Sequence, residues 1–209
     1  MRRLSATAVA AALLASSAAE AQSAPPTLDA LLERFAAAPG FEARFVEEKR
    51  IALLAVPVRS EGRIWFAPPG RLMRRVERPD PSAALIADGR LRMRQGERTE
   101  EISVEGNAVL RGFVDSFRAV LAGDRAALSR FYRAEYAPAP DGSWQLTLRP
   151  RDEALSRFVR EIRLRGRGVT IVEMHMIEAN GDETRTTFSD VDTARRFSDA
   201  EARRIFRID

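Results

Sequence analysis

The distribution of apolar and polar positions divides the chain into one helical segment followed mainly by short alternating segments. Leucines and Phe35 recur every three or four residues over 28–35, as on one face of a helix, and Thr27 can cap that helix. Pro39 and Gly40 end it. Residues 41–47, FEARFVE, then alternate apolar and polar side chains, which is typical of a half-buried strand.

Residues 62–93 carry the densest set of turn signals in the chain. Their sequence is GRIWFAPPGRLMRRVERPDPSAALIADGRLRM. Proline presets φ for a turn, glycine accepts a positive φ, and Asp-Gly between apolar runs indicates a hairpin. Turns are therefore expected at 68–70, 79–81 and 88–89, and they separate four short strands.

The preceding run, residues 51–58 with the sequence IALLAVPV, is apolar without alternation. Pro57 cannot donate to a ladder, so a central strand is excluded there. A bent strand pair or a loop packed on the edge of the sheet is expected instead.

The second half of the chain returns to strands after a helical interruption. A strand is expected near 98–104, helical spacing governs 109–121, Gly123 can stop that helix, and Asp124 can cap another short one. Further strands are expected at 131–137, 144–148, 158–164, 169–178 and 184–191, with a last short helix capped at Ser198. About ten strands joined by hairpin turns, with helices at one end and in the middle, indicate an α+β domain with an antiparallel sheet.

The N-terminus predicts export. Arg2 and Arg3 precede an alanine- and leucine-rich run over 6–19, and the A-x-A sequence of 19–21 follows, as in a secretory signal peptide. The run is short for a membrane span, which needs about 20 apolar residues. Because no Phe-Leu-Lys follows the twin arginines, we expect Sec export, with 1–21 removed and 22–209 forming a single domain. An uncleaved anchor is the alternative.

Composition narrows the function classes. The absence of cysteine excludes disulfides, thiolate metal sites and lipid attachment behind the signal. The net charge is +4, and nearly every basic residue is arginine, with Lys49 as the only lysine. These charges interleave with acidic residues, so a solvated surface is expected and nucleic acid is not expected as a partner. An exported chain without an anchor is expected to be a soluble resident of the periplasm.

Catalytic chemistry has few candidates. His175 is the only histidine, and any catalytic triad or histidine-based metal site must use it. Glu173 has the same strand parity and is a hypothetical partner, although a half-exposed histidine beside a carboxylate is the favoured interpretation. The glycines lack the spacing of a phosphate loop. We therefore expect no enzyme activity, no metal and no cofactor.

Large apolar side chains at alternating positions predict a shared apolar surface. An ordinary hydrophobic core is the plain interpretation of these residues alone, although methionine suits surfaces that accept varied apolar partners. The candidate ligand-binding residues are Ile64, Phe66, Leu72 and Leu85 on one sheet face, Phe113 and Phe117 on the middle helix, and Met174 and Met176 on a later strand.

The order of these motifs resembles the LolA family of periplasmic lipoprotein carriers. The family pattern G-x-L-W … P … P … L-[VI]-x-D-G-x-x-L is matched by Gly62, Ile64, Trp65, Pro69, Pro79, Leu85, Ile86, Asp88, Gly89 and Leu91. The pattern F-x-A-x-F-x-Q is matched by Phe41, Ala43 and Phe45, with Glu47 in the place of the glutamine. The resemblance implies an antiparallel open half β-barrel of about 10–11 strands, with helices lidding a concave face that lines a cavity for acyl chains.

The resemblance also implies a function, and the sequence departs from the family pattern in two places that bear on it. The expected protein is a monomeric periplasmic carrier of lipoproteins or other acylated lipid, loaded by an inner-membrane complex and emptied at an outer-membrane acceptor. The alternative is an envelope sensor or interaction module on the same scaffold. Family carriers latch the lid with an arginine directly before the first proline, but Pro68 stands there, so Arg71 or Arg74 is the candidate latch. The family's F-x-W falls on Leu72 and Arg74, and a charged group fits poorly in a fully apolar cavity.

Overall fold

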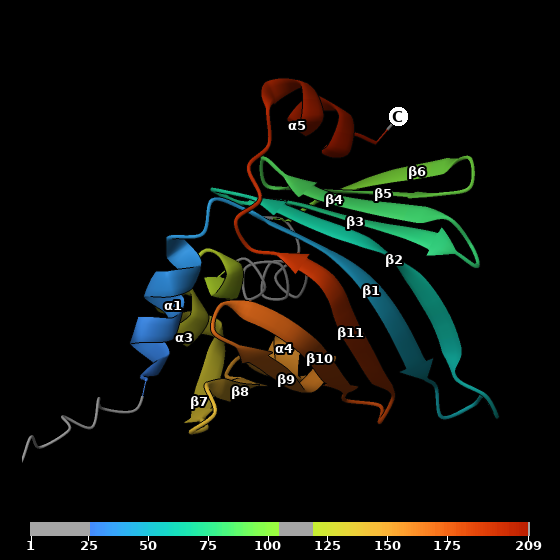
Figure 1. The fold of residues 1–209 in the computed structure, drawn as a ribbon. Coiled ribbons are helices and arrows are strands. Elements are labelled where there is room, and N and C mark those ends of the chain that lie inside the picture. The colour runs from blue at the N-terminus through green and yellow to red at the C-terminus, as the bar shows by residue number, and fades with distance from the viewer. Residues whose placement is uncertain (1–25, 105–118, 209) are drawn as a thin grey trace, which may run out of the picture.

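The computed structural model describes residues 26–104 and 119–208. Its main body is a single eleven-stranded sheet that curves into an open barrel without closing (Figure 1). Every strand pairs antiparallel with its neighbours in the sheet. The expected α+β class with an open antiparallel half-barrel is confirmed.

Most of the expected strands are present among the eleven that the structure contains in the described residues. They are β1 (Phe41–Arg50), β2 (Val58–Ala67), β3 (Arg71–Arg78), β4 (Ser82–Ala87), β5 (Arg90–Gln95), β6 (Arg98–Ser103), β7 (Tyr132–Pro138), β8 (Ser143–Pro150), β9 (Val159–Arg167), β10 (Thr170–Glu178) and β11 (Glu183–Asp192). The helices that the structure describes are α1 (Leu28–Ala36), α3 (Arg125–Phe131), α4 (Glu153–Ser156) and α5 (Asp199–Ile205).

The sheet consists of two meanders that meet at the first and last strands. Its order is β6-β5-β4-β3-β2-β1-β11-β10-β9-β8-β7. Within the first meander the predicted Asp-Gly turn is confirmed, because Asp88 and Gly89 have φ angles of 51° and 71°, as this hairpin turn requires. Strands β1 and β11 pair with Phe45 opposite Phe188, so residues from both ends of the chain share the middle of the sheet.

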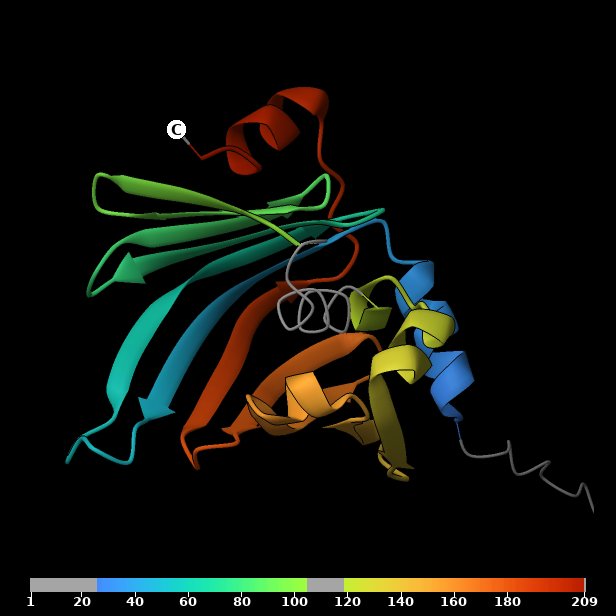
Figure 2. The same cartoon turned by 180° about the vertical axis from the view of Figure 1, so that it is seen from behind.

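Helices α1 and α3 lie side by side at one end of the barrel (Figures 1 and 2). Thr27 caps α1 as predicted, accepting a hydrogen bond from Ala30 N at 3.2 Å. The ring of Phe35 meets that of Trp144 edge to face at 6.2 Å between centroids, which joins α1 to the sheet. Gly123 has a φ of 67° and approaches α1 so closely that a Cβ would lie 2.0 Å from the carbonyl oxygen of Leu32.

We call the concave side of the sheet the inner face and the opposite side the outer face. The inner face carries the main core cluster, which includes Phe45, Ile64, Phe66 and Leu72. The outer face carries a second cluster beneath α5, which lies above β4 in Figure 1. Its buried members are Trp65, Met73, Ala83, Leu85, Ile205 and Ile208.

The expectation that Leu85 shares a sheet face with Ile64 and Leu72 is therefore wrong. The register of β3 and β4 places Met73 opposite Leu85 and Leu72 opposite Ile86. Strand β4 is apolar on both faces, so alternation alone could not decide which residue points inward. A shift of one residue in register reverses every side chain of a strand.

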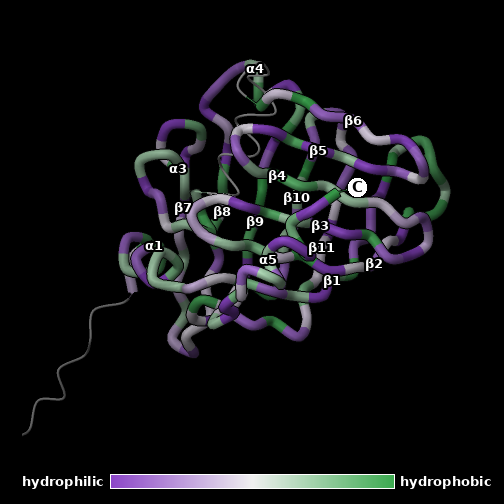
Figure 3. Tube along the Cα trace, turned by 90° about the horizontal axis from the view of Figure 1, so that it is seen from above, coloured by the Kyte–Doolittle hydropathy of each residue, from purple (hydrophilic) through white to green (hydrophobic). Residues whose placement is uncertain are grey.

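Residues 51–57 form the loop between β1 and β2, which we call the tip. The expected strand pair or edge-packed loop is wrong, because β1 continues to Arg50 and the apolar run projects beyond the sheet. Leu53 is 94% exposed and Val56 72% exposed. Ala52 N donates to Asp182 Oδ1 at 3.0 Å and ties the tip to the β10–β11 turn. The tip is the green apolar segment at the right of Figure 3.

Two expectations lie outside the described residues: the signal peptide over 1–21, and Phe113 and Phe117 of the middle helix. Val120 and Leu121, from the end of the same expected helix, are buried in the inner-face core. None of the helices in residues 26–104 and 119–208 has the length and apolar content that a membrane crossing requires.

Candidate functional site

An apolar cavity of about 300 Å³ lies on the inner face, between the two meanders. It is lined by Phe45, Glu47, Ile64, Leu72, Arg74, Ile86, Met174, Met176, Thr184, Thr186 and Phe188. Most of these side chains are apolar, and the polar ones are concentrated on β1, β3 and β11. A concave, mostly apolar cavity with a few placed polar groups is typical of a small-molecule site.

The structure brings together four of the predicted ligand-binding residues: Ile64, Leu72, Met174 and Met176 line the cavity. Phe66 is buried in the inner-face core without lining the cavity. Leu85 lies on the outer face, as described above.

Sequence reasoning missed Phe45, Ile86 and Phe188 as lining residues. The F-x-A-x-F-x-Q pattern contains Phe45, whereas the inward direction of Ile86 follows only from its pairing with Leu72 in the sheet. Phe188 shares strand parity with Thr184 and Thr186, but only the β1–β11 pairing places that face against the cavity.

A charged pair lies within the cavity wall. Arg74 Nη2 donates to Glu47 Oε1 at 2.9 Å, and the guanidinium lies over the ring of Phe45, 4.3 Å from its centroid. Thr186 Oγ1 donates to the second carboxylate oxygen, Oε2, at 3.2 Å. The pair explains how a charged group is accommodated here, because an ion partner and an aromatic face both offset its desolvation. Glu47 and Arg74 occupy the positions of the family's glutamine and aromatic residue.

The two candidate latch residues lie on opposite faces. Arg71 points to the outer face, with its guanidinium 5.2 Å from the ring centroid of Phe206. Arg74 points into the cavity. Arg74 is therefore the candidate that a lid over the inner face can reach, and its role as a latch stays a prediction.

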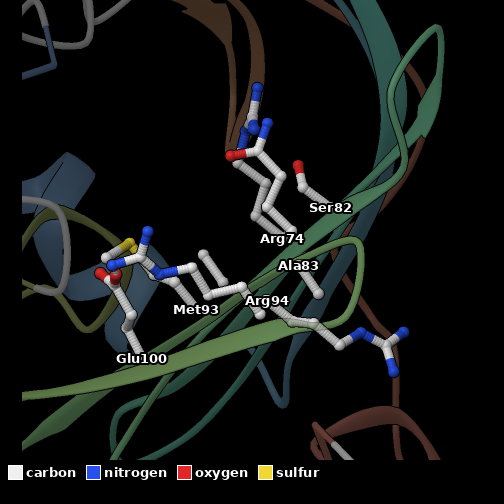
Figure 4. A pocket seen from close by; sticks show the side chains of 9 residues that line it. Arg74, Ser82, Ala83, Met93, Arg94 and Glu100 are labelled. Atoms are coloured by element: carbon white, nitrogen blue, oxygen red, sulfur yellow. Dashed lines mark ion pairs between the residues drawn. The ribbon is translucent and has the colours of Figure 1, made fainter.

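A polar pocket of about 340 Å³ adjoins the apolar cavity, and Arg74 lines both (Figure 4). The register places Arg74, Ala84, Met93 and Glu100 in one row across β3 to β6. Ser82, Gln95 and Arg98 form the next row. Arg98 Nη2 lies 2.7 Å from Glu100 Oε1. Arg94 also borders the pocket, but its side chain is directed away from Arg74 in Figure 4.

The hypothesis of a catalytic Glu173–His175 pair is wrong. His175 Nε2 lies 3.1 Å from Glu183 Oε2 on the neighbouring strand. Glu173 instead forms ion pairs with Arg165 and Arg185, at 3.7 and 3.3 Å. Within the described ranges no group of three or more histidine, aspartate or glutamate residues is placed to hold a metal ion.

Comparison with known proteins gives one extensive match. A family model described as outer membrane lipoprotein carrier protein LolA-like matches residues 17–206. A search of curated proteins finds no match. The match therefore rests on the family model, which spans both meanders of the sheet.

Solved structures with a similar fold include three from named bacteria. A LolA superfamily protein, NE2245, from Nitrosomonas europaea is 11% identical, with 83% of this chain and 96% of that chain covered and a TM-score of 0.43. A putative outer membrane lipoprotein-sorting protein domain from Vibrio parahaemolyticus is 10% identical, with 86% and 96% covered and a TM-score of 0.48. The MucA/MucB complex of Pseudomonas aeruginosa matches at 15% identity, with 83% and 59% covered and a TM-score of 0.47.

Proposed function

The chain belongs to the LolA-like family of outer membrane lipoprotein carrier proteins, and on that premise we propose that it is a periplasmic carrier of acyl chains. The cargo in this proposal is a lipoprotein or a related acylated lipid, sheltered in the inner-face cavity and delivered toward the outer membrane. The observation that carries the proposal is the apolar cavity enclosed by Phe45, Ile64, Leu72 and the two methionines of β10.

Such a carrier needs no chemical reaction. Each CH₂ group of an acyl chain costs about 0.8 kcal/mol when it is exposed to water, so an apolar shelter is sufficient to keep the chain in solution. The half-buried Met174 and Met176 add side chains that adapt to ligands of different shape. Release then requires an acceptor that binds the chain better than the cavity does.

The tip supports the delivery step. Phe158, in the turn directly before β9, is 58% exposed and lies at the same end of the sheet, because Val159 pairs with Glu178 near the β10–β11 turn that holds Ala52. Exposed apolar side chains gathered at one place mark a contact surface. The exposed Arg50 and Arg59 flank them and suit an anionic membrane surface. We propose that this end of the barrel faces the acceptor, with a loading complex in the inner membrane as the other partner.

The carrier proposal is tested by native mass spectrometry of protein isolated from the periplasm. We expect a bound lipid or acylated peptide that leaves when the protein is denatured. Met176→Asp should lower its occupancy by placing a carboxylate in the cavity wall, whereas Val46→Asp, a half-buried change on the outer side of β1, should leave occupancy unchanged.

A protein that is always empty and binds neither detergent nor fatty acid is not a carrier. Capture of a stoichiometric membrane-protein partner without lipid would instead favour the sensor or interaction module.

A further inference from the structure

Arg74 stands at the boundary between the apolar cavity and the polar pocket. On one side of it lie Phe45, Leu72 and Ile86, and on the other lie Ser82, Gln95 and Arg98. Figure 4 shows the Arg74 side chain rising from the sheet beside Ser82. A ligand with its chain in the cavity therefore ends at a guanidinium, with polar side chains beyond it.

The hydrogen-bond donors at this boundary exceed the acceptors. A guanidinium carries five N–H donors. In the part of the chain that the structure describes, Arg74 donates one hydrogen bond, from Nη2 to Glu47. Both oxygens of Glu47 are engaged, one by Arg74 and the other by Thr186. Glu100 is similarly neutralised by Arg98 at 2.7 Å. The remaining donors of both arginines, with the Ser82 hydroxyl and the Gln95 amide, match a group that only accepts hydrogen bonds.

Carboxylates and phosphates are such groups, and arginine binds both through two parallel hydrogen bonds. We infer that the inner face binds an acidic amphiphile, with its chain in the apolar cavity and its carboxylate or phosphate received by Arg74 at the edge of the polar pocket. This inference rests on the proposed carrier function and specifies the chemical class of the cargo.

The test compares ligands with one chain and different heads. Laurate, dodecyl phosphate and dodecanol are titrated into the full-length mature protein in mildly alkaline buffer, and binding is followed by calorimetry. The two acids should bind at least about ten-fold more tightly than the alcohol, because a charge-assisted hydrogen bond is worth more than about 1.4 kcal/mol. The tighter of the two acids then identifies the head as a carboxylate or a phosphate.

Equal affinity for all three ligands overturns the inference and leaves the carrier proposal standing. Failure of all three to bind overturns both.

Variants of the charged pair test the assigned contact. Arg74→Gln should remove the preference for the two acids over dodecanol. Since this change leaves Glu47 half-buried without its ion partner, the double variant Glu47→Gln/Arg74→Gln keeps the pair uncharged and should show the same loss. Glu47→Gln alone should tighten binding of the acids, because the ligand no longer competes with a carboxylate for Arg74.

Arg44→Gln is the matched control, because Arg44 lies on the opposite face of β1 from Glu47 and pairs with Asp190 at 3.2 Å across an exposed surface. It should leave all three affinities unchanged. A loss of acid binding in Arg44→Gln equal to that in Arg74→Gln overturns the assignment, as does an acid preference that survives in both Arg74 variants.

Discussion

Gly62 lies in β2 where the register with β3 shifts, and the backbone of β3 occupies the space of a side chain. A Cβ on this residue would lie 1.9 Å from the carbonyl oxygen of Arg75 and 3.0 Å from Cα of Val76. We expect Gly62→Ala to lower the free energy of unfolding by about 1–3 kcal/mol or more, because the strands must move apart.

Urea denaturation measures this loss, and Gly96→Ala is the comparison. Gly96 has a φ of 59°, and a Cβ on it would have no heavy atom within 4 Å, so its substitution meets backbone strain of about 1–2 kcal/mol without a clash. A smaller loss in Gly62→Ala than in Gly96→Ala contradicts the close approach of the strands.

The contribution of Glu201 to the stability of the folded protein depends on pH. Its pKa is lowered from 4.5 to about 2, chiefly because Arg195 donates a hydrogen bond to its carboxylate, and further because the backbone N–H and hydroxyl of Ser198 do so. A folded-state pKa below the unfolded value gives stability that is fully present above about pH 4.5 and is lost as the pH falls toward 2.

Glu201→Gln should therefore be less stable than the wild type at neutral pH, and the difference between the two should shrink as the solution is acidified through this range. Urea unfolding of both proteins at a series of pH values measures it. A difference that stays constant down to the acid end contradicts the assigned ionisation.

Single residues also show where sequence reasoning reaches its limit. The turn at Asp88 and Gly89 follows from local chemistry, because both residues tolerate the positive φ that the hairpin needs. The inward direction of Ile86, rather than Leu85, depends on pairing with β3 and has no local signal. The partner of Arg74 is likewise non-local, since Glu47 lies two strands away.

At the scale of elements, α5 depends on one arginine of the sheet. Arg75 Nη2 lies within hydrogen-bond distance of the carbonyl oxygens of Arg204, Ile205 and Arg207, at 3.3, 3.0 and 3.3 Å. The carbonyls of Arg204 and Ile205 are at the C-terminal end of the helix and have no partner within it, and Arg207 follows the C-cap residue Phe206. Arg75→Gln should lower the free energy of unfolding by about 1–3 kcal/mol.

The loss is measured by urea denaturation, with the fluorescence of Trp65 beneath α5 as one probe. Arg71→Gln serves as the comparison, because the guanidinium of Arg71 lies over the ring of Phe206, the C-cap residue of α5, and the loss of this contact should cost no more than about 1 kcal/mol. Equal losses in the two variants contradict the capping role of Arg75.

Elements bounded by proline and glycine turns could be predicted from the sequence. The position of an element that packs against a distant segment could not. The prolines and glycines of residues 68–89 set the strand boundaries from β2 to β5. The single turn of α4 was missed, although Asp152 caps it by accepting from Leu155 N at 3.0 Å, because one turn has no periodicity to detect. The last helix was expected, but its position on the outer face follows from Trp65 and Met73, which the helix sequence does not reveal.

At the scale of the whole molecule, the exposed apolar tip leads us to predict that ligand is transferred to a membrane at this end of the barrel. Leu53 and Leu54 are 94% and 51% exposed and do not line the cavity. Leu53→Ser/Leu54→Ser should therefore leave stability and ligand affinity unchanged. It should slow transfer of a fluorescent fatty acid to vesicles with anionic lipid by at least about ten-fold, since burial of each leucine in the membrane interface is worth about 1.5–3 kcal/mol.

Transfer is followed by the change in fluorescence on mixing loaded protein with vesicles. Val172→Ser removes another exposed apolar side chain, 43% exposed near the opposite end of β10, and should transfer at the wild-type rate. Transfer by the tip variant at the wild-type rate contradicts the assigned orientation.

The pairing of β1 with β11 also determines when in synthesis the cavity becomes complete. Phe45, Ile64 and Leu72 are made early in synthesis, whereas Met174, Met176 and Phe188 are among the last strand residues to emerge. The cavity has only one wall until β11 docks against β1. Under the proposed carrier function, a partly completed chain therefore cannot hold an acyl chain, and loading must wait until the entire sheet has been produced.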